Sequence, residues 1–126
     1  MKATDLMLGD WVLCDLTPYQ IAEISAGLLC IDAERELFAT PEDIRPIPLT
    51  PEILEKNNIT AKRAEEIYVF YNSDDFCITP NIDSNRKMCW MFYCGRKEHD
   101  ANICIYFVHQ LQHALRLCGI EKEVVL

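Results

Sequence analysis

Long apolar runs and glycine-rich loops are both missing from this chain. No stretch approaches the roughly 18 consecutive apolar residues of a membrane span, so no transmembrane helix is predicted. The opening residues MKATDLMLGD carry Asp5 and Asp10 where a signal peptide has its apolar core, so we expect a cytoplasmic protein without a membrane partner. The four glycines are isolated at turn or cap positions, which excludes the phosphate-binding glycine loops.

Basic residues are scarce in the first half. Residues 1–60 hold four basic and eleven acidic side chains, a net −7, so the remaining residues contribute −1 to the total of −8. Such a field repels phosphate backbones, and nucleic acid is therefore an unlikely general partner. The one candidate basic patch, interpreted as two solvated turns, comprises Arg86, Lys87, Arg96 and Lys97.

The seven cysteines do not form a secreted disulfide framework. Their number is odd, and most alternate with apolar neighbours, where a reduced cysteine behaves as a small buried hydrophobe. We expect free thiols in a reducing compartment. At 126 residues, the chain can bury a core without disulfides or metals, and we predict a single domain over residues 1–126.

The best-formed predicted element is a helix within Ile105–Ile120. Gly119 is placed as a C′ glycine, with Ile120 able to contact Leu115, so the helix should end at about Cys118. We expect the preceding segment, 101–105, to be a strand. An apolar stripe at helical spacing predicts one buried face, formed by Cys104, Val108, Leu111, Leu115 and Cys118, with Phe107 and Ala114 beside it.

Two histidines on the opposite, polar face, His109 and His113, have the i, i+4 spacing of HExxH zinc hydrolases. Gln110 stands where the catalytic glutamate would be, so we interpret both histidines as solvated. No local signature singles out a cysteine nucleophile either. We expect no enzymatic activity and no cofactor.

Short strands dominate the rest. Residues 1–49 predict an SH3-like or strongly bent β lobe, with a hairpin turn at Ala26-Gly27 and an edge strand at Pro46. Thr50 and Pro51 predict an N-cap and first turn of a short helix, and residues 61–66 a second helical turn, so residues 50–66 form a helical connection. Residues 67–126 predict an antiparallel sheet covered by the C-terminal helix, with strands at 67–71, 76–79, 88–94 and 101–105, a loop at 80–85 and an edge strand at 123–126. The predicted class is α+β.

One set of residues has partial metal-ligand spacing. Cys89, Cys94, His99 and Cys104 follow C-x4-C-x4-H-x4-C, and the part from Cys94 onward looks like the second half of a retroviral-type zinc knuckle, which would bind single-stranded nucleic acid. Four residues separate the first two cysteines where a knuckle has two, and in a strand they would point to opposite faces. We therefore favour no metal.

Aromatic residues cluster in the second half and at Trp11. Trp11, Trp90, Phe92 and Tyr93 form the candidate binding surface for a protein partner. The alternative is that the aromatic stripe is simply core.

Three stretches carry a resemblance: LGDWV at residues 8–12, IRPIPLTPEILEKN at residues 44–57 and YFVHQLQHALRLCGIEKE at residues 106–123. Together they resemble a family of small uncharacterised proteins of gut bacterial genomes and prophage-like regions. The resemblance implies a cytoplasmic, phage-associated accessory protein and no activity. We expect a non-enzymatic protein-binding or adaptor module; the alternatives are the zinc-knuckle-like nucleic-acid binder and an acidic inhibitor that mimics DNA.

Overall fold

The computed structural model describes residues 1–64, 68–72, 75–96 and 99–126. The chain divides into two compact units. One comprises Met1–Pro48 with Phe107–His109, and the other Leu49–Tyr106 with Gln110–Leu126. The first unit ends one residue before the predicted end of the β lobe, and the predicted helical connection belongs to the second unit.

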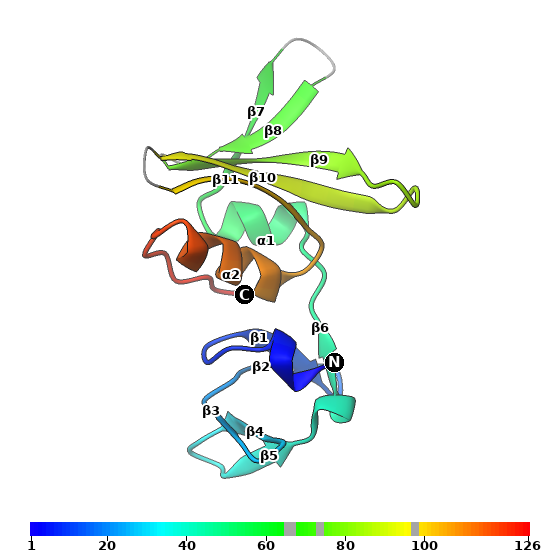
Figure 1. Cartoon of the computed structure of the whole chain (residues 1–126), viewed down its shortest axis with the longest axis vertical. Coiled ribbons are helices and arrows are strands. Elements are labelled where there is room, and N and C mark those ends of the chain that lie inside the picture. The colour runs from blue at the N-terminus through cyan, green and yellow to red at the C-terminus, as the bar shows by residue number, and fades with distance from the viewer. Residues whose placement is uncertain (65–67, 73–74, 97–98) are drawn as a thin grey trace. The chain divides into compact units, whose positions relative to one another are not determined.

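The first unit contains two three-stranded antiparallel sheets and two short 3-10 turns (Figure 1). Alternating side chains from both sheets meet in one apolar core. One sheet has the order β2-β1-β6 and the other β3-β4-β5, so the SH3-like topology stays a prediction. The strands are β1 (Trp11–Cys14), β2 (Thr17–Gln20), β3 (Glu23–Ser25), β4 (Leu28–Asp32), β5 (Leu37–Ala39) and β6 (Ile44–Pro46). The core comprises Leu6, Val12, Ile21, Leu29, Ile31, Ala39 and Ile44.

Two local predictions for this unit are confirmed. Ala26 and Gly27 both adopt positive φ and form the turn between β3 and β4, as expected for a two-residue hairpin. Pro46 lies in β6, at the edge of its sheet, where its missing N–H leaves no ladder bond unmade.

The second unit is a five-stranded antiparallel sheet in the order β11-β10-β9-β8-β7, with α1 and α2 on one of its faces (Figure 1). This arrangement confirms the α+β class. The elements are α1 (Pro51–Lys56), β7 (Thr60–Ala64), β8 (Tyr68–Asn72), β9 (Phe76–Ile82), β10 (Met88–Arg96), β11 (His99–Ile105) and α2 (Val108–Leu117). Phe76 and Phe92 stack on the helix side with ring centroids 5.2 Å apart, and Tyr71 meets Trp90 edge-on at 5.5 Å.

The start of α1 and the end of α2 are as predicted, whereas α2 begins at Val108, two residues later than expected. The Thr50 hydroxyl accepts from the backbone N–H of Ile53 at 3.3 Å, and Pro51 is the first helical residue of α1. Beyond α2, Gly119 has φ 68° and donates to Arg116 O, while Ile120 donates to Leu115 O at 2.8 Å. These two bonds are the Schellman motif.

Three secondary-structure predictions are wrong. Residues 60–64 form β7 rather than a helical turn, because pairing with β8 outweighs local helix propensity. β9 continues through Pro80 to Ile82, where a loop was predicted; Pro80 lies beyond the β8–β9 pairs Tyr71↔Ile78 and Asn72↔Cys77 and pairs with Trp90. Residues 123–126 form no strand, and Val125 instead exchanges hydrogen bonds with the Asn57 side chain.

The prediction that the polar face of α2 is exposed to solvent is wrong for two of its residues. The predicted apolar stripe is buried at Val108, Leu111, Leu115 and Cys118, whereas Cys104 lies on β11 and is exposed. On the polar face, His109 is 5% exposed and Gln112 is 7% exposed. Polarity alone marks a residue as able to face water, whereas tertiary packing decides whether it does. Among the described residues, no helix is both long enough and apolar enough to cross a membrane.

Candidate functional site

The strands β9 and β10 form a hairpin that reaches past the helices of its unit (Figure 1). Its end, residues 82–88, is called the hairpin tip here. Ile82 and Met88 are directly paired and are 63% and 78% exposed. Because side chains alternate along a strand, both lie on the face that carries Trp90 further along β10. The tip therefore places two adjacent apolar side chains in solvent.

Asp83 holds the turn of the hairpin tip together. Its Oδ1 accepts from the backbone N–H groups of Asn85 at 2.8 Å and Lys87 at 2.9 Å, and its Oδ2 accepts from the Tyr106 hydroxyl at 2.6 Å. The Asp83 backbone pairs with Lys87 O and Arg86 N. Arg86 adopts φ 62°, which is unfavourable for a residue other than glycine, and the hydrogen bonds of the turn offset this cost. The tip is thus a pre-organised loop.

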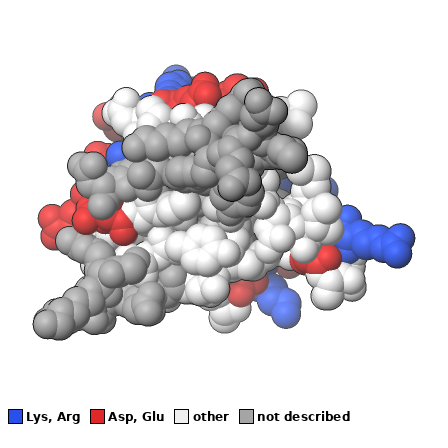
Figure 2. All heavy atoms as spheres, turned by 90° about the horizontal axis from the view of Figure 1, so that it is seen from above, with Lys and Arg blue, Asp and Glu red and all other residues white. Residues whose placement is uncertain are grey.

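The acidic side chain of the hairpin tip is held by hydrogen bonds, whereas its two basic side chains are exposed to solvent. The Tyr106 hydroxyl, followed by the backbone N–H of Lys87, lowers the pKa of the Asp83 carboxyl. That carboxylate is ionised at neutral pH and engaged by its donors, whereas Arg86 and Lys87 are exposed. Figure 2 shows basic side chains at the edge toward which the hairpin extends and uncharged atoms across the middle of this face. A locally basic tip stands out in a chain of net charge −8.

Tyr106 connects the tip to a pair of cysteines on β10 and β11. Hydrogen bonds to Asp83, and then to Cys104, raise the pKa of the Tyr106 phenol. Burial, and then the hydrogen bond with Cys104, raises the pKa of the Cys89 thiol to about 11. A continuous polar chain therefore runs from Cys89 through Cys104 and Tyr106 to Asp83.

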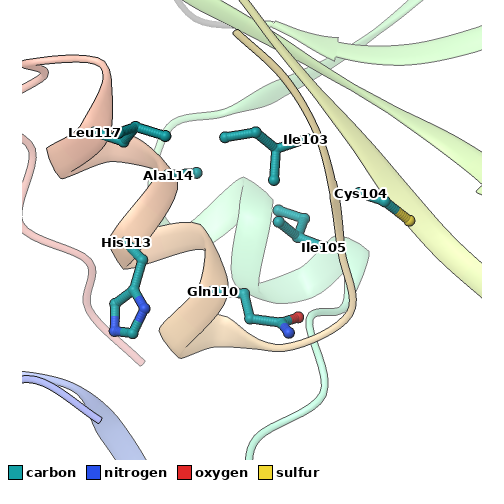
Figure 3. Close-up of a pocket in the computed structure, with 7 residues that line it drawn as sticks. All are labelled: Ile103, Cys104, Ile105, Gln110, His113, Ala114 and Leu117. Atoms are coloured by element: carbon teal, nitrogen blue, oxygen red, sulfur yellow. The ribbon is translucent and has the colours of Figure 1, made fainter. Parts of the chain in front are cut away.

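A pocket of about 340 Å³ lies between β11 and α2 (Figure 3). Ile103 and Leu117 point toward one another across it, while the sulfur of Cys104 points away. Gln110 Oε1 accepts from Tyr106 N at 2.7 Å, which orients the amide at one end. The volume is at the lower end of the range for small-molecule sites. Its lining comprises Ile103, Cys104, Ile105, Gln110, His113, Ala114 and Leu117.

The zinc candidates are distributed over both faces of the sheet. Cys89 and Cys94 are buried and, five residues apart on β10, point to opposite faces, whereas Cys104 lies opposite Met91 on the face of Cys89. The His99 side chain lies outside the described residues. Within the described part of the chain, no group of three or more histidine, cysteine, aspartate or glutamate side chains is placed to hold a metal ion.

The predicted aromatic surface separates into core and surface residues. Phe92 is fully buried and is a core residue. Trp90 shares its face, is half-buried, and donates from its indole N–H to Leu49 O at 3.0 Å. Tyr93, on the opposite face, is 42% exposed, and Trp11 is half-buried on the face of β1 opposite Val12. Within the second unit, Trp90 and Tyr93 therefore lie on opposite faces of the sheet, and Phe92 is not a surface residue.

The two histidines of α2 have different environments. His109 is buried, and its ring stacks on that of Phe107 with centroids 5.9 Å apart. His113 lines the pocket and is half-buried. Neither is the solvated residue that the sequence predicted.

Sequence reasoning missed Ile82, Asp83 and Met88. One signal was available, because Asp83-Ser84-Asn85 is a sequence in which an aspartate accepts a backbone hydrogen bond two residues on. The pairing of Ile82 with Met88 follows from that turn. Their exposure does not, because it depends on where the helices end relative to the hairpin.

Comparison with known proteins does not identify the chain: no family model, curated protein or solved structure matches it. The resemblance to proteins of prophage-like regions therefore stays a prediction.

Proposed function

We propose that the chain is a non-enzymatic protein-binding module, acting in the cytoplasm as an accessory protein of phage or mobile-element origin, which contacts its partner through the hairpin tip. The observation that supports this most is the paired, exposed Ile82 and Met88 on a turn already ordered by Asp83. A loop that is ordered before binding loses little conformational entropy on binding.

The chemistry of the tip defines the partner surface. Ile82 and Met88 would enter an apolar depression, and the flexible thioether of Met88 suits an irregular one. Arg86 and Lys87 would lie against carboxylates at the rim of that depression. These charges would mainly set the association rate, whereas the apolar pair would set the lifetime of the complex.

The test is capture of the partner from the cell by a photo-crosslinking amino acid introduced at position 88. Partners captured there are then measured against purified Met88→Glu, with Leu16→Glu as the matched control, since Leu16 is 92% exposed on a turn of the first unit. We expect at least about a tenfold loss of affinity in Met88→Glu, the effect of removing an interface anchor, and none in the control. Repeated failure to capture any protein, or equal binding by both variants, would contradict the proposal.

The first unit favours a second candidate, the acidic inhibitor that mimics DNA. Residues 1–48 hold nine acidic and three basic side chains. The exposed acids are Asp5, Asp15, Glu23, Glu34, Glu36, Glu42 and Asp43. Such a protein would bind a DNA-handling enzyme in a salt-sensitive way and would not bind DNA. The variant Glu34→Lys/Glu36→Lys should weaken that complex and leave a tip-mediated complex unchanged.

A further inference from the structure

Cys89 and Cys104 are neighbours across the β10–β11 ladder. Cys104 is paired with Met91, and Cys89 lies two residues before Met91 on the same face. The two thiols are hydrogen-bonded to each other. This is a diagonal cross-strand pair, close enough for side chains to interact.

The two thiols differ in access. All seven cysteines are free, and of these Cys104 is the exposed one, while Cys89 is 3% exposed. A solution oxidant therefore reaches Cys104 first and has Cys89 directly behind it. This arrangement of an accessible sulfur beside a second, resolving cysteine is the one that redox-sensing cysteines use.

We propose that Cys89 and Cys104 are a reversible thiol-oxidation site for hydrogen peroxide and small organic hydroperoxides. The Cys104 thiol gives up its proton and the thiolate attacks the peroxide, so that an S–O bond forms as the O–O bond breaks. The departing oxygen takes up that proton, which leaves a sulfenic acid and releases water or the alcohol. The Cys89 sulfur then attacks the Cys104 sulfur, the S–O bond breaks, and the Cys89 proton leaves with the oxygen as water. Two thiols lose two electrons and two protons, and the peroxide is reduced.

Oxidation has a structural route to the hairpin tip. The disulfide ends the thiol hydrogen bond and draws the diagonal pair together, since bridged cysteines need Cα atoms no more than about 7 Å apart. Cys104 is hydrogen-bonded to Tyr106, whose hydroxyl holds Asp83. The oxidised protein should therefore have a less ordered tip. The effect on partner binding rests on the proposed function, whereas disulfide formation does not.

The test treats the reduced full-length protein with hydrogen peroxide, then counts thiols after denaturation and maps linked peptides by mass spectrometry. We expect the loss of two thiols per chain, a bond between Cys89 and Cys104, and recovery with dithiothreitol. Cys89 and Cys94 share one tryptic peptide, so Cys94→Ala is the matched control and should still form the bond. Cys104→Ser should abolish it, and Cys89→Ser should leave a Cys104 sulfenic acid that dimedone traps.

Three outcomes would overturn the site: no disulfide, a disulfide lost in Cys94→Ala but retained in Cys89→Ser, or oxidation that dithiothreitol does not reverse. The expected loss of order in the hairpin tip on oxidation is measured separately, by trypsin cleavage after Arg86 and Lys87. Faster cleavage in the oxidised protein supports it, and equal cleavage refutes it. Neither measurement requires a partner, so failure of the proposed function is recognised separately.

Discussion

At the scale of single residues, buried hydrogen-bonding side chains connect segments distant in the sequence. Asn57, 4% exposed, donates from its amide to Ile53 O at 2.8 Å and to Val125 O at 2.7 Å, and it accepts from Val125 N at 2.7 Å. It thereby joins the end of α1 to the C-terminal segment, which has no strand to pair with. A single amide replaces the predicted β-ladder there.

Asn57→Ala should lower the free energy of unfolding by about 2 kcal/mol, because it removes three hydrogen bonds of a buried side chain, two of which hold the C-terminal segment at Val125. Urea denaturation at constant pH measures the change. Asn81→Ala, which removes an exposed amide on β9, serves as the control and should lie within about 0.5 kcal/mol of wild type. Equal losses in the two variants would show that the Asn57 bonds contribute nothing specific.

Asp83 predicts a pH dependence whose sign follows from its bonds. Its pKa is lowered in the folded chain, so its contribution to stability is complete above roughly pH 5 and is lost as the pH falls through the folded pKa. The difference in Tm between wild type and Asp83→Asn should be constant at neutral pH and shrink toward acid. Thermal melts across that range test this, and a difference that grew in acid would refute the assigned direction.

At the scale of elements, the end of α2 depends on one backbone conformation. Gly119 takes φ 68°, which lets Ile120 donate to Leu115 O and brings Ile120, 8% exposed, into the core. A residue with a Cβ is strained in this conformation. The helix end and the burial of Ile120 are therefore one feature.

Gly119→Ala should destabilise the protein by about 1–2 kcal/mol, the cost of a left-handed non-glycine residue. Denaturant midpoints compared at an unchanged m-value provide the measurement. Glu121→Ala, at an exposed position just beyond the motif, should have little effect. A neutral Gly119→Ala would mean that the chain leaves α2 by another turn in solution.

At the scale of the whole molecule, the cysteines report on packing in both units. Cys30, Cys89, Cys94 and Cys118 are buried, Cys14 and Cys77 are half-buried, and Cys104 is exposed. Burial raises the pKa of Cys14 and of Cys77, which slows their reaction further. The seven cysteines therefore differ in solvent exposure, and they are not all buried packing residues.

Titration with a thiol reagent should modify Cys104 first in the native protein and all seven cysteines once the chain is unfolded. The zinc content of the same protein, purified without a histidine tag, should be measured together with this titration. One zinc per chain, with Cys104 protected until a chelator is added, would restore the zinc-knuckle alternative and remove the oxidation site. Adding chelator to metal-free protein should change neither reactivity nor Tm.

Local chemistry was enough to predict several elements from sequence. Thr50 begins a helix because its hydroxyl accepts a hydrogen bond from a backbone N–H of the first turn, and Pro51 suits that turn because it has no N–H that needs a partner. Gly119 ends a helix because it tolerates positive φ. The apolar stripe of α2 and the hairpin at Ala26-Gly27 followed in the same way. Each depends on interactions within a few residues.

Only the tertiary structure decided what lies side by side and what is left in water. Residues 60–64 became a strand because β8 lies beside them, and His109 and Gln112 were buried despite their polarity. The exposure of Ile82 and Met88, and the meeting of Cys89 with Cys104 rather than Cys94, depend on strand register and on the reach of the helices. These are non-local quantities, set by the sum of many weak contacts, and no short stretch of the sequence contains them.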